Sequence, residues 1–311
     1  MNDTSFVLTL AAAVAAAVPI ALAALGELLS EKAGVLNLGV EGMMLIGAVV
    51  AFQTGDSFGN LWLALLVGGL AGALFASIHA VLCVTMRANQ IVSGLALTIF
   101  GTGLSTFIGK SIEGKPLATD FVSTAWGPLA DIPVLGPVLF DQDPIVYGTI
   151  VAAVVIAFYL NRTKAGLSLR AVGESPATAD SMGVAVTAVR YVHVMLGGLF
   201  AGLAGAYLVL DQVPSWSQDG TTAGIGWIAI ALVVFAGWKP IRVLLGAFLF
   251  GFARRANFWL QGEGVDIPAE FLSMMPYLLT VIVLVVWGTR DLRRKLGAPA
   301  ALGIPYARDE R

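Results

Sequence analysis

The sequence predicts an all-α protein, a polytopic transmembrane helical bundle of about nine spans, within a range of about 8–10. Of its 311 residues, 58% are hydrophobic and only 12% are charged, against roughly 45–50% and about 25% in ordinary soluble proteins. The apolar residues are concentrated in blocks near the ~17–25 residues that a helix needs to cross the hydrocarbon core. Blocks of this length exceed the about 9–11 alternating residues of a barrel strand. The composition therefore excludes a soluble enzyme and favours helices that span a bilayer.

Nine apolar blocks follow one another along the chain, and each is expected to form one span. They are residues 6–26, 36–52, 61–83, 90–109, 144–160, 189–210, 223–237, 241–260 and 271–288. The second block begins with polar residues and the seventh is short, so either could be broken or re-entrant. The stretches 67–73 and 196–202 are alike and would run in opposite directions, which suggests an inverted repeat. The glycines in them that would allow close helix approach are Gly68, Gly72, Gly198 and Gly202.

The distribution of Lys and Arg orients the predicted bundle, because short cytoplasmic loops carry an excess of these residues. Most of the 18 Lys and Arg residues fall on one side if the C-terminus is cytoplasmic, whereas the loops of the other side hold Lys110 and Lys115 among many acids. The N-terminus is then expected outside. The large connections are an outer loop at 110–143, a cytoplasmic loop at 161–190 and a cytoplasmic tail at 289–311.

The cytoplasmic loop contains a clear local signal for a short helix. Ser175 is a good N-cap, Pro176 suits the first helical position and Gly183 is a natural stop. A small, mostly apolar face would be formed by three residues of this helix, Ala177, Ala179 and Met182. On local chemistry alone, the helix either ties two spans together or enters a partner.

Polar residues inside the apolar blocks are candidates for a substrate path, because such residues are costly in a membrane. The candidates are Asn37, Glu41, Asn89, Gln90, Ser93, Thr98 and Thr102. Gly34 and Gly39 would let the segment before Glu41 unwind, as broken helices do at transporter sites, or approach a neighbouring helix closely. The alternative for Glu41 is a structural hydrogen bond. Asn89 could instead cap the fourth helix, and the Thr hydroxyls could bond to their own helix backbone.

Two adjacent charges, Arg254 and Arg255, lie in the eighth block. At the bilayer centre they would cost about 5–7 kcal/mol, more than the about 4 kcal/mol that the apolar residues of the block contribute. They are therefore expected toward the outer interface, beyond a break at Gly251, or paired with an acid such as Glu263 or Asp211. One possible role is an outer gate or a contact with an external binding protein, and the alternative is snorkelling to the interface or structural pairing.

Three segments resemble a known family. Residues 174–183, ESPATADSMG, are similar to the cytoplasmic coupling loop of ABC importer permeases. Residues 26–47, GELLSEKAGVLNLGVEGMMLIG, and 87–97, RANQIVSGLAL, resemble the branched-chain amino acid/ribose permease superfamily in its nucleoside (simple-sugar-like) branch. The loop departs from the commoner Glu-Asn-Pro-x-Ala-Ala at Ser175 and Thr178 but keeps the cap. The resemblance covers nearly the whole chain, so 1–311 is expected to form one transmembrane permease domain.

The resemblance implies a non-enzymatic, membrane-spanning subunit of an ATP-driven importer in a bacterial inner membrane. Nucleosides are the expected solute, with ribose, other simple sugars and branched-chain amino acids as alternatives. The implied partners are membrane lipid, a second and usually different permease chain, an external substrate-binding lipoprotein and an ABC ATPase, often a fused double-domain chain. ATP and Mg would bind to that ATPase, and no cofactor is expected on this chain. The implied coupling residues are Arg170, Gly173, Glu174, Ser175, Pro176, Ala177, Ala179 and Gly183.

A carrier driven by ions or protons is the alternative from another class, with Glu41 and His79 as proton sites. His79 stands alone in its block, and a hydrogen-bonded core histidine is the other interpretation. No second His or carboxylate lies at ligand spacing, so no metal site is predicted. The sequence has no basic footprint of the kind that binds nucleic acid.

Overall fold

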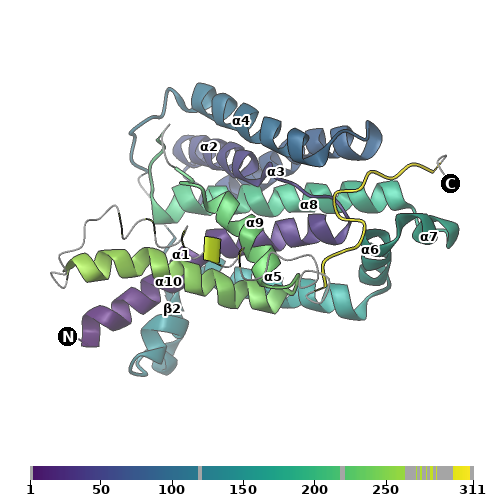
Figure 1. Cartoon of the computed structure of the whole chain (residues 1–311). Coiled ribbons are helices and arrows are strands. Elements are labelled where there is room, and N and C mark those ends of the chain that lie inside the picture. Colours follow the sequence, from purple (N-terminus) through teal and green to yellow (C-terminus); the bar gives the residue numbers. More distant parts are fainter. Residues whose placement is uncertain are drawn as a thin grey trace.

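The structure, a computed structural model, describes residues 3–117, 121–217, 221–262 and 297–308, with isolated positions between 271 and 285. Helices dominate these residues, as the all-α prediction requires (Figure 1). They are α1 (Asp3–Lys32), α2 (Val40–Phe58), α3 (Leu61–Ala80), α4 (Gln90–Gly109), α5 (Pro144–Arg162), α6 (Lys164–Glu174), α7 (Pro176–Ser181), α8 (Val186–Tyr207), α9 (Ile225–Phe235) and α10 (Pro240–Gly262).

Short elements complete the description. In the predicted outer loop, β1 (Thr124–Ala125) and β2 (Asp141–Gln142) form a small antiparallel ribbon, which is an exception to the all-α prediction. The remaining short elements are π-helical turns at Val81–Thr85, Gly136–Phe140 and Leu208–Gln212, and a 3-10 turn at Gly127–Leu129.

Six helical segments of the described chain are long and apolar enough to cross a membrane. They are Ser5–Lys32, Leu61–Thr85, Gln90–Gly109, Pro144–Arg162, Val186–Gln212 and Pro240–Gly262. They coincide with the first, third, fourth, fifth, sixth and eighth predicted blocks, so the prediction of a polytopic membrane protein is confirmed. The ninth block and the tail from 289 to 296 lie outside the described residues, apart from isolated positions, so the count of about nine spans stays a prediction.

The second and seventh blocks, which the sequence marks as irregular, differ from the other spans. α9 has only 11 residues, too few to cross ~30 Å of hydrocarbon. α2 has 19 residues but carries Glu41, Gln53 and Asp56. Residues 40–49 are all buried, so the first half of α2, with Glu41, is enclosed by protein instead of lipid.

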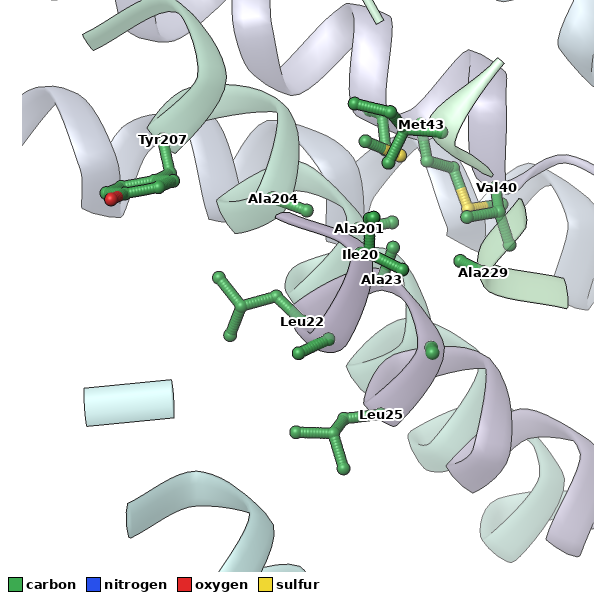
Figure 2. Close-up of a cluster of buried hydrophobic side chains, with 14 of the residues drawn as sticks. Ile20, Leu22, Ala23, Leu25, Val40, Met43, Ala201, Ala204, Tyr207 and Ala229 are labelled. Carbon is green, nitrogen blue, oxygen red and sulfur yellow. The ribbon is translucent and has the colours of Figure 1, made fainter. Parts of the chain in front are cut away.

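The core lies around α1, whose residues 16–31 are all buried. α1 packs against α8, α10 and α9, while α8 also packs against α2 and α3. Figure 2 shows part of this core, including Ala23 of α1, Met43 of α2, Ala201 of α8 and Ala229 of α9. Small residues in such contacts let helix backbones approach closely, which favours dispersion contacts between helices in a membrane.

α3 and α8 approach each other closely at the glycines that the sequence marks as permitting close helix packing. A methyl group at Gly72 would overlap the carbonyl oxygen of Gly198, and one at Gly202 would overlap that of Gly68. Because Gly68 meets Gly202 while Gly72 meets Gly198, the two helices run antiparallel. The two similar glycine-rich stretches thus pack directly against each other, whereas the inverted repeat stays a prediction.

α6 and α7 lie at one end of the bundle, where residues 297–308 return to the helices (Figure 1, yellow). The backbone N–H of Ala301 donates to the carbonyl of Gly173 at 2.9 Å, and that of Gly303 donates to the carbonyl of Gly34 at 3.2 Å. The N-terminus lies at the opposite end (Figure 1). The predicted cytoplasmic loop therefore contains two helices in place of one, and the described part of the tail packs against them.

Candidate functional site

A break, residues 33–39, separates α1 from α2 and lies inside the protein. Gly34 has φ +83°, a left-handed conformation that glycine adopts without a steric penalty and that turns the chain out of α1. The prediction that this segment unwinds is confirmed. Irregular backbone at membrane depth is tolerated only where other groups satisfy its N–H and C=O groups. The partners of the break are therefore decisive for this part of the fold.

The predicted path residue Gln90 and the histidine His79 bind the break at Leu36. The backbone N–H of Leu36 donates to Gln90 Oε1 at 2.7 Å, and the Leu36 carbonyl lies 3.1 Å from His79 Nε2. Because a carbonyl only accepts, Nε2 carries the proton, and Nδ1 of a neutral His79 accepts from Ser93 Oγ at 3.0 Å. His79 is thus a hydrogen-bonded core histidine, as the second interpretation of the sequence proposes.

The rest of the break is held in the same way. The backbone N–H of Asn37 donates to Glu27 Oε1 at 2.9 Å, while the Asn37 side chain accepts from the N–H of Gly39 at 2.9 Å. Thr98 Oγ1 donates to the carbonyl of Leu38 at 2.9 Å. Asn37 and Thr98 therefore shape the break instead of presenting free polar groups.

Gln90 retains one polar atom without a partner. Its side chain is 3% exposed, and its Nε2 has no hydrogen-bond partner among the described residues. The orientation of the amide follows from the Leu36 N–H, which needs the oxygen. A buried donor left unpaired costs about 1–3 kcal/mol. This N–H group beside the break is thus available to a polar solute or to water.

Glu41 joins the start of α2 to the start of α9. Its carboxylate accepts hydrogen bonds from Thr222 Oγ1, from the N–H of Gly224 at 3.0 Å and from the N–H of Gly226 at 2.7 Å. Gly224 (φ +75°) is the N-cap of α9, and the helix dipole favours an anion there. A methyl group at Gly226 would lie 2.6 Å from Glu41 Oε2. The second and seventh blocks, both predicted to be irregular, therefore meet at one carboxylate.

Two further path candidates are engaged within α4. Asn89 Oδ1 accepts from the N–H of Val92 at 3.1 Å, so the predicted alternative of a helix cap is confirmed. Thr102 Oγ1 donates to the carbonyl of Thr98 at 2.9 Å, within its own helix. Of the seven candidates, those that the structure brings together are Asn37, Gln90, Ser93 and Thr98 around the break, with Glu41 next to it.

A small cavity of about 160 Å³ lies between the middle of α1, the turn that follows α8, and α10. Arg254 and Arg255 line it together with Gln212. Arg255 Nη2 donates to Gln212 Oε1 at 2.9 Å, and Gln212 Nε2 donates to Asp211 Oδ2 at 2.9 Å. Arg255 thus reaches a predicted acid through a glutamine. The other acid considered, Glu263, lies outside the described residues.

The predicted break at Gly251 is wrong, because α10 is continuous from Pro240 to Gly262. A methyl group at Gly251 would overlap the carbonyl oxygen of Ala13 and the backbone of Ala17 in α1. The glycine therefore serves close packing of α10 on α1, a role that a single sequence does not distinguish from a helix break.

α7 has the ends that the sequence predicts but not the predicted face. Ser175 is its N-cap and accepts from the N–H of Thr178 at 3.4 Å, and Gly183 follows with φ +83°. Ala179 is 4% exposed and packs in a small cluster of buried residues in this loop, whereas Ala177 and Met182 are exposed. The prediction of one face is wrong, because residues two positions apart in a helix lie about 200° apart around its axis.

The other predicted coupling residues fall into an exposed and a buried group. Arg170 and Glu174 are exposed, and Ser175 and Pro176 are half-buried. Gly173 is buried, and a methyl group there would overlap the carbonyl oxygen of Lys32 at the end of α1. Gly173 therefore joins the predicted cytoplasmic loop to α1 instead of offering a surface.

Two arginines connect residues 297–308 to this end of the bundle. The sequence does not predict the role of one of them, Arg190. Arg190 of α8 is 1% exposed, and its guanidinium donates to the carbonyl of Ala33 and to that of Ile304, each at 3.2 Å. On the surface, Arg308 Nε lies 3.3 Å from Asp180 Oδ2 of α7. Arg190 carries no local signal, since a basic residue on the cytoplasmic side is expected to be exposed.

Among the residues that the structure describes, no group of three or more His, Cys, Asp or Glu side chains could hold a metal ion. Cys83 is buried, with its sulfur 3.6 Å from His79 Nδ1.

The chain is similar to permease subunits along most of its length. The family model described as a branched-chain amino acid transport system permease component matches residues 9–284. TsgC13 of Haloferax volcanii, an ABC transporter permease provisionally named for glucose, is 42% identical over 96% of this chain and 97% of its own length. The guanosine ABC transporter permease NupQ of Bacillus subtilis is 39% identical over 95% of each chain.

Two further relatives concern nucleosides and the pairing of permeases. The nucleoside ABC transporter permease NupC of Lactococcus lactis is 36% identical over 94% of each chain. Bacillus subtilis also has NupP, a second guanosine permease that is 25% identical over 90% of this chain and 81% of its own length. No solved structure matches the chain. The chain therefore belongs to the branched-chain amino acid transport permease family and is a permease subunit of an ABC transporter, a multi-pass membrane protein and not an enzyme.

Proposed function

We propose that this chain forms half of the translocation pathway of an ATP-driven nucleoside importer and is driven through α7. The observation that supports the coupling role is the geometry of α7. This capped helix exposes Ala177 and Met182 to solvent or to a partner, while Ala179 is buried against the protein. The similarity to guanosine and nucleoside permeases supports the choice of solute.

A continuous set of contacts supports transmission from α7 to the interior. Ala179 packs with Val172 of α6 and Val186 of α8. In α6, Gly173 lies against the backbone of Lys32 at the end of α1. α1 ends at the break, and α2 begins beyond it with Glu41, which holds α9. A displacement of α7 by a partner would therefore reach both discontinuous helices.

The break is proposed as the inner part of the solute path. Gln90 supplies a free buried donor there, and Glu41 keeps the start of α9 in place. In this scheme Asn37, Ser93 and Thr98 position the break, and Asn89 and Thr102 stabilise α4. The cavity beside Arg254 and Arg255 is proposed as the outer gate.

The proposed assembly contains a second, different permease, an ABC ATPase that binds ATP and Mg, and an external substrate-binding lipoprotein. The paired relatives NupQ and NupP support a heterodimer of permeases. The whole chain, 1–311, is proposed as one permease domain with the N-terminus outside and the C-terminus in the cytoplasm. The opposite positions of the N-terminus and of residues 297–308 in the bundle support this orientation (Figure 1).

Glucose is the second candidate solute, because TsgC13 is 42% identical to this chain. Uptake by cells decides between the two. The gene for this chain is deleted and then restored, and uptake of radiolabelled guanosine, uridine, glucose and leucine is measured in each strain. Loss of guanosine and uridine uptake, restored with the gene, is the expected result. Loss of glucose uptake alone would favour the second candidate, and loss of leucine uptake alone would overturn both.

A second measurement addresses the energy source. The purified transporter with its partners is reconstituted in proteoliposomes, and nucleoside uptake is compared with ATP and with an imposed proton gradient. ATP alone is expected to drive uptake. Uptake driven by the proton gradient without ATP would instead support a secondary carrier.

A further inference from the structure

A basic cavity of about 600 Å³ lies at the α6–α7 end of the bundle, and none of the proposed path residues lines it. It is lined by the end of α1, the end of α5, α6 and the turn between α9 and α10. Four of its lining residues are basic, Lys32, Arg170, Lys239 and Arg242, and no acidic residue among those described lines it. Positive charge gathered from α1, α6 and the start of α10 predicts an anionic ligand.

The remaining lining is largely apolar. It includes Leu160 of α5, Ile241 of α10 and Trp238, which is 3% exposed and donates its indole N–H to Glu31. Next to the cavity, α5 and α10 pack on each other and expose apolar side chains such as Phe158 and Leu245. A ligand at this place meets cations at one end and an apolar helix surface at the other.

The cations of the cavity are only partly neutralised by their neighbours. Lys32 Nζ donates one hydrogen bond to the carbonyl of Gly297 at 2.9 Å, which leaves two of its three donors. The acids that act on Lys32 are Glu174 and Glu31, whereas Arg170 and Lys239 repel it. Glu174 is exposed and Glu31 accepts from Trp238, so neither occupies the cavity.

We propose that this cavity binds the phosphate group of an anionic phospholipid, whose acyl chains lie along the exposed apolar faces of α5 and α10. Basic pockets between spans on the cytoplasmic side take such headgroups. The amphipathic setting favours a lipid over a free anion, since inorganic phosphate would use the cations alone. The cytoplasmic leaflet follows from the proposed orientation of the chain, but the site itself does not depend on the transported solute.

A bound headgroup would connect elements that the proposed mechanism uses. Lys32 precedes the break, Arg170 belongs to α6 next to the coupling helix, and Lys239 and Arg242 lie where α9 ends and α10 begins. One phosphate held by these side chains would bridge α1, α6 and α10. The lipid would therefore stabilise the relative positions of the coupling loop and α9.

Lipid binding by the purified full-length protein tests the proposal. Native mass spectrometry measures binding of phosphatidylglycerol and of phosphatidylcholine to the delipidated wild type and to the double variant Arg170→Gln/Arg242→Gln. The matched control is Arg162→Gln/Lys164→Gln, which removes the same charge from exposed residues on the same side that do not line the cavity. Phosphatidylglycerol is expected to bind the first variant about 10- to 30-fold more weakly than the wild type, and the control within about 3-fold.

Three results would overturn the proposal. The first is equal binding of both lipids to the wild type, and the second is equal weakening of phosphatidylglycerol binding in both double variants. The third is displacement of phosphatidylglycerol by millimolar inorganic phosphate, which would assign the cavity to a soluble anion. Size-exclusion profiles without added lipid show whether each variant folds. If Arg170→Gln/Arg242→Gln fails to fold, the single variant Lys239→Gln is measured instead, and the same selective weakening is expected.

Discussion

The carboxylate of Glu41 accepts a hydrogen bond from the backbone N–H of Gly226 at 2.7 Å, although 185 positions separate the two residues. The bond connects the first turn of α2 with the first turn of α9. Neither helix is among the six that resemble ordinary spans. An anion placed on the free N–H groups of a helix start stabilises both the helix and the charge. The two irregular segments are therefore held as one unit inside the bundle.

Replacing Glu41 is expected to separate this unit. The amide of Glu41→Gln has one acceptor oxygen in place of two. Its NH2 group cannot accept a hydrogen bond from the N–H donors of α9. Because hydrogen bonds to a charged group contribute about 1.5–3 kcal/mol each, we expect a loss of about 2–4 kcal/mol of unfolding free energy and of most uptake. Thermal unfolding in detergent and nucleoside uptake measure the two effects. Glu174→Gln, at an exposed position, is the control and is expected to change stability by less than about 0.5 kcal/mol.

Glycine substitutions test the contact between α3 and α8. Gly72→Ala is expected to destabilise the protein by about 1–3 kcal/mol, because the added methyl group overlaps the backbone of α8. The control is Gly103→Ala in α4, where nothing lies within 4 Å of the added atom. That change is expected to stabilise the helix by about 0.5–1 kcal/mol. Equal effects of the two variants on thermal unfolding would contradict the packing of α3 on α8.

A bulky residue on α7 distinguishes an effect on ATPase docking from an effect on folding. Ala177→Trp is expected to abolish ATP-dependent uptake and co-purification of the ATPase while the unfolding temperature stays within about 2 °C of the wild type, because Ala177 is exposed. Ala165→Trp, at an exposed alanine of α6, is the matched control and is expected to retain both. If the two variants behave alike, α7 has no special role in docking.

Cysteine labelling tests the proposed orientation. Single cysteines are introduced by Ser123→Cys in the outer loop and Ala177→Cys in α7, both at exposed positions, in a Cys83→Ala background. An impermeant maleimide added to intact cells is expected to label only Ser123→Cys, whereas permeabilised cells are expected to show both. Labelling of both variants in intact cells would reject the topology.

The sequence predicts those features that depend on neighbours along the chain. Apolar blocks of sufficient length mark the six clear spans, and Ser175, Pro176 and Gly183 mark the ends of α7, because hydropathy and capping are local properties. The sequence also identifies Gln90 and Thr98 as costly residues in a membrane. It does not show that they bind the backbone of Leu36 and Leu38.

Features that depend on contacts across the chain were predicted incompletely or not at all. Ala179 is turned inward by its packing in the α6–α8 cluster, which an isolated α7 sequence does not reveal. Gly251 allows packing on α1, although glycine in an apolar helix equally suggests a break. Arg190 is buried because carbonyl groups of the break and of Ile304 surround it. In each case the deciding partner is distant in sequence.

The contacts of residues 297–308 also determine when this end of the molecule can be completed during biosynthesis. Gly34 is synthesised long before Gly303, yet its carbonyl accepts a hydrogen bond from the N–H of Gly303, and the guanidinium of Arg190 donates to the carbonyl of Ile304. These hydrogen bonds can form only after every helix of the described bundle has been synthesised. A nascent chain would therefore expose an incomplete form of the proposed coupling surface until residues 297–308 have packed against it.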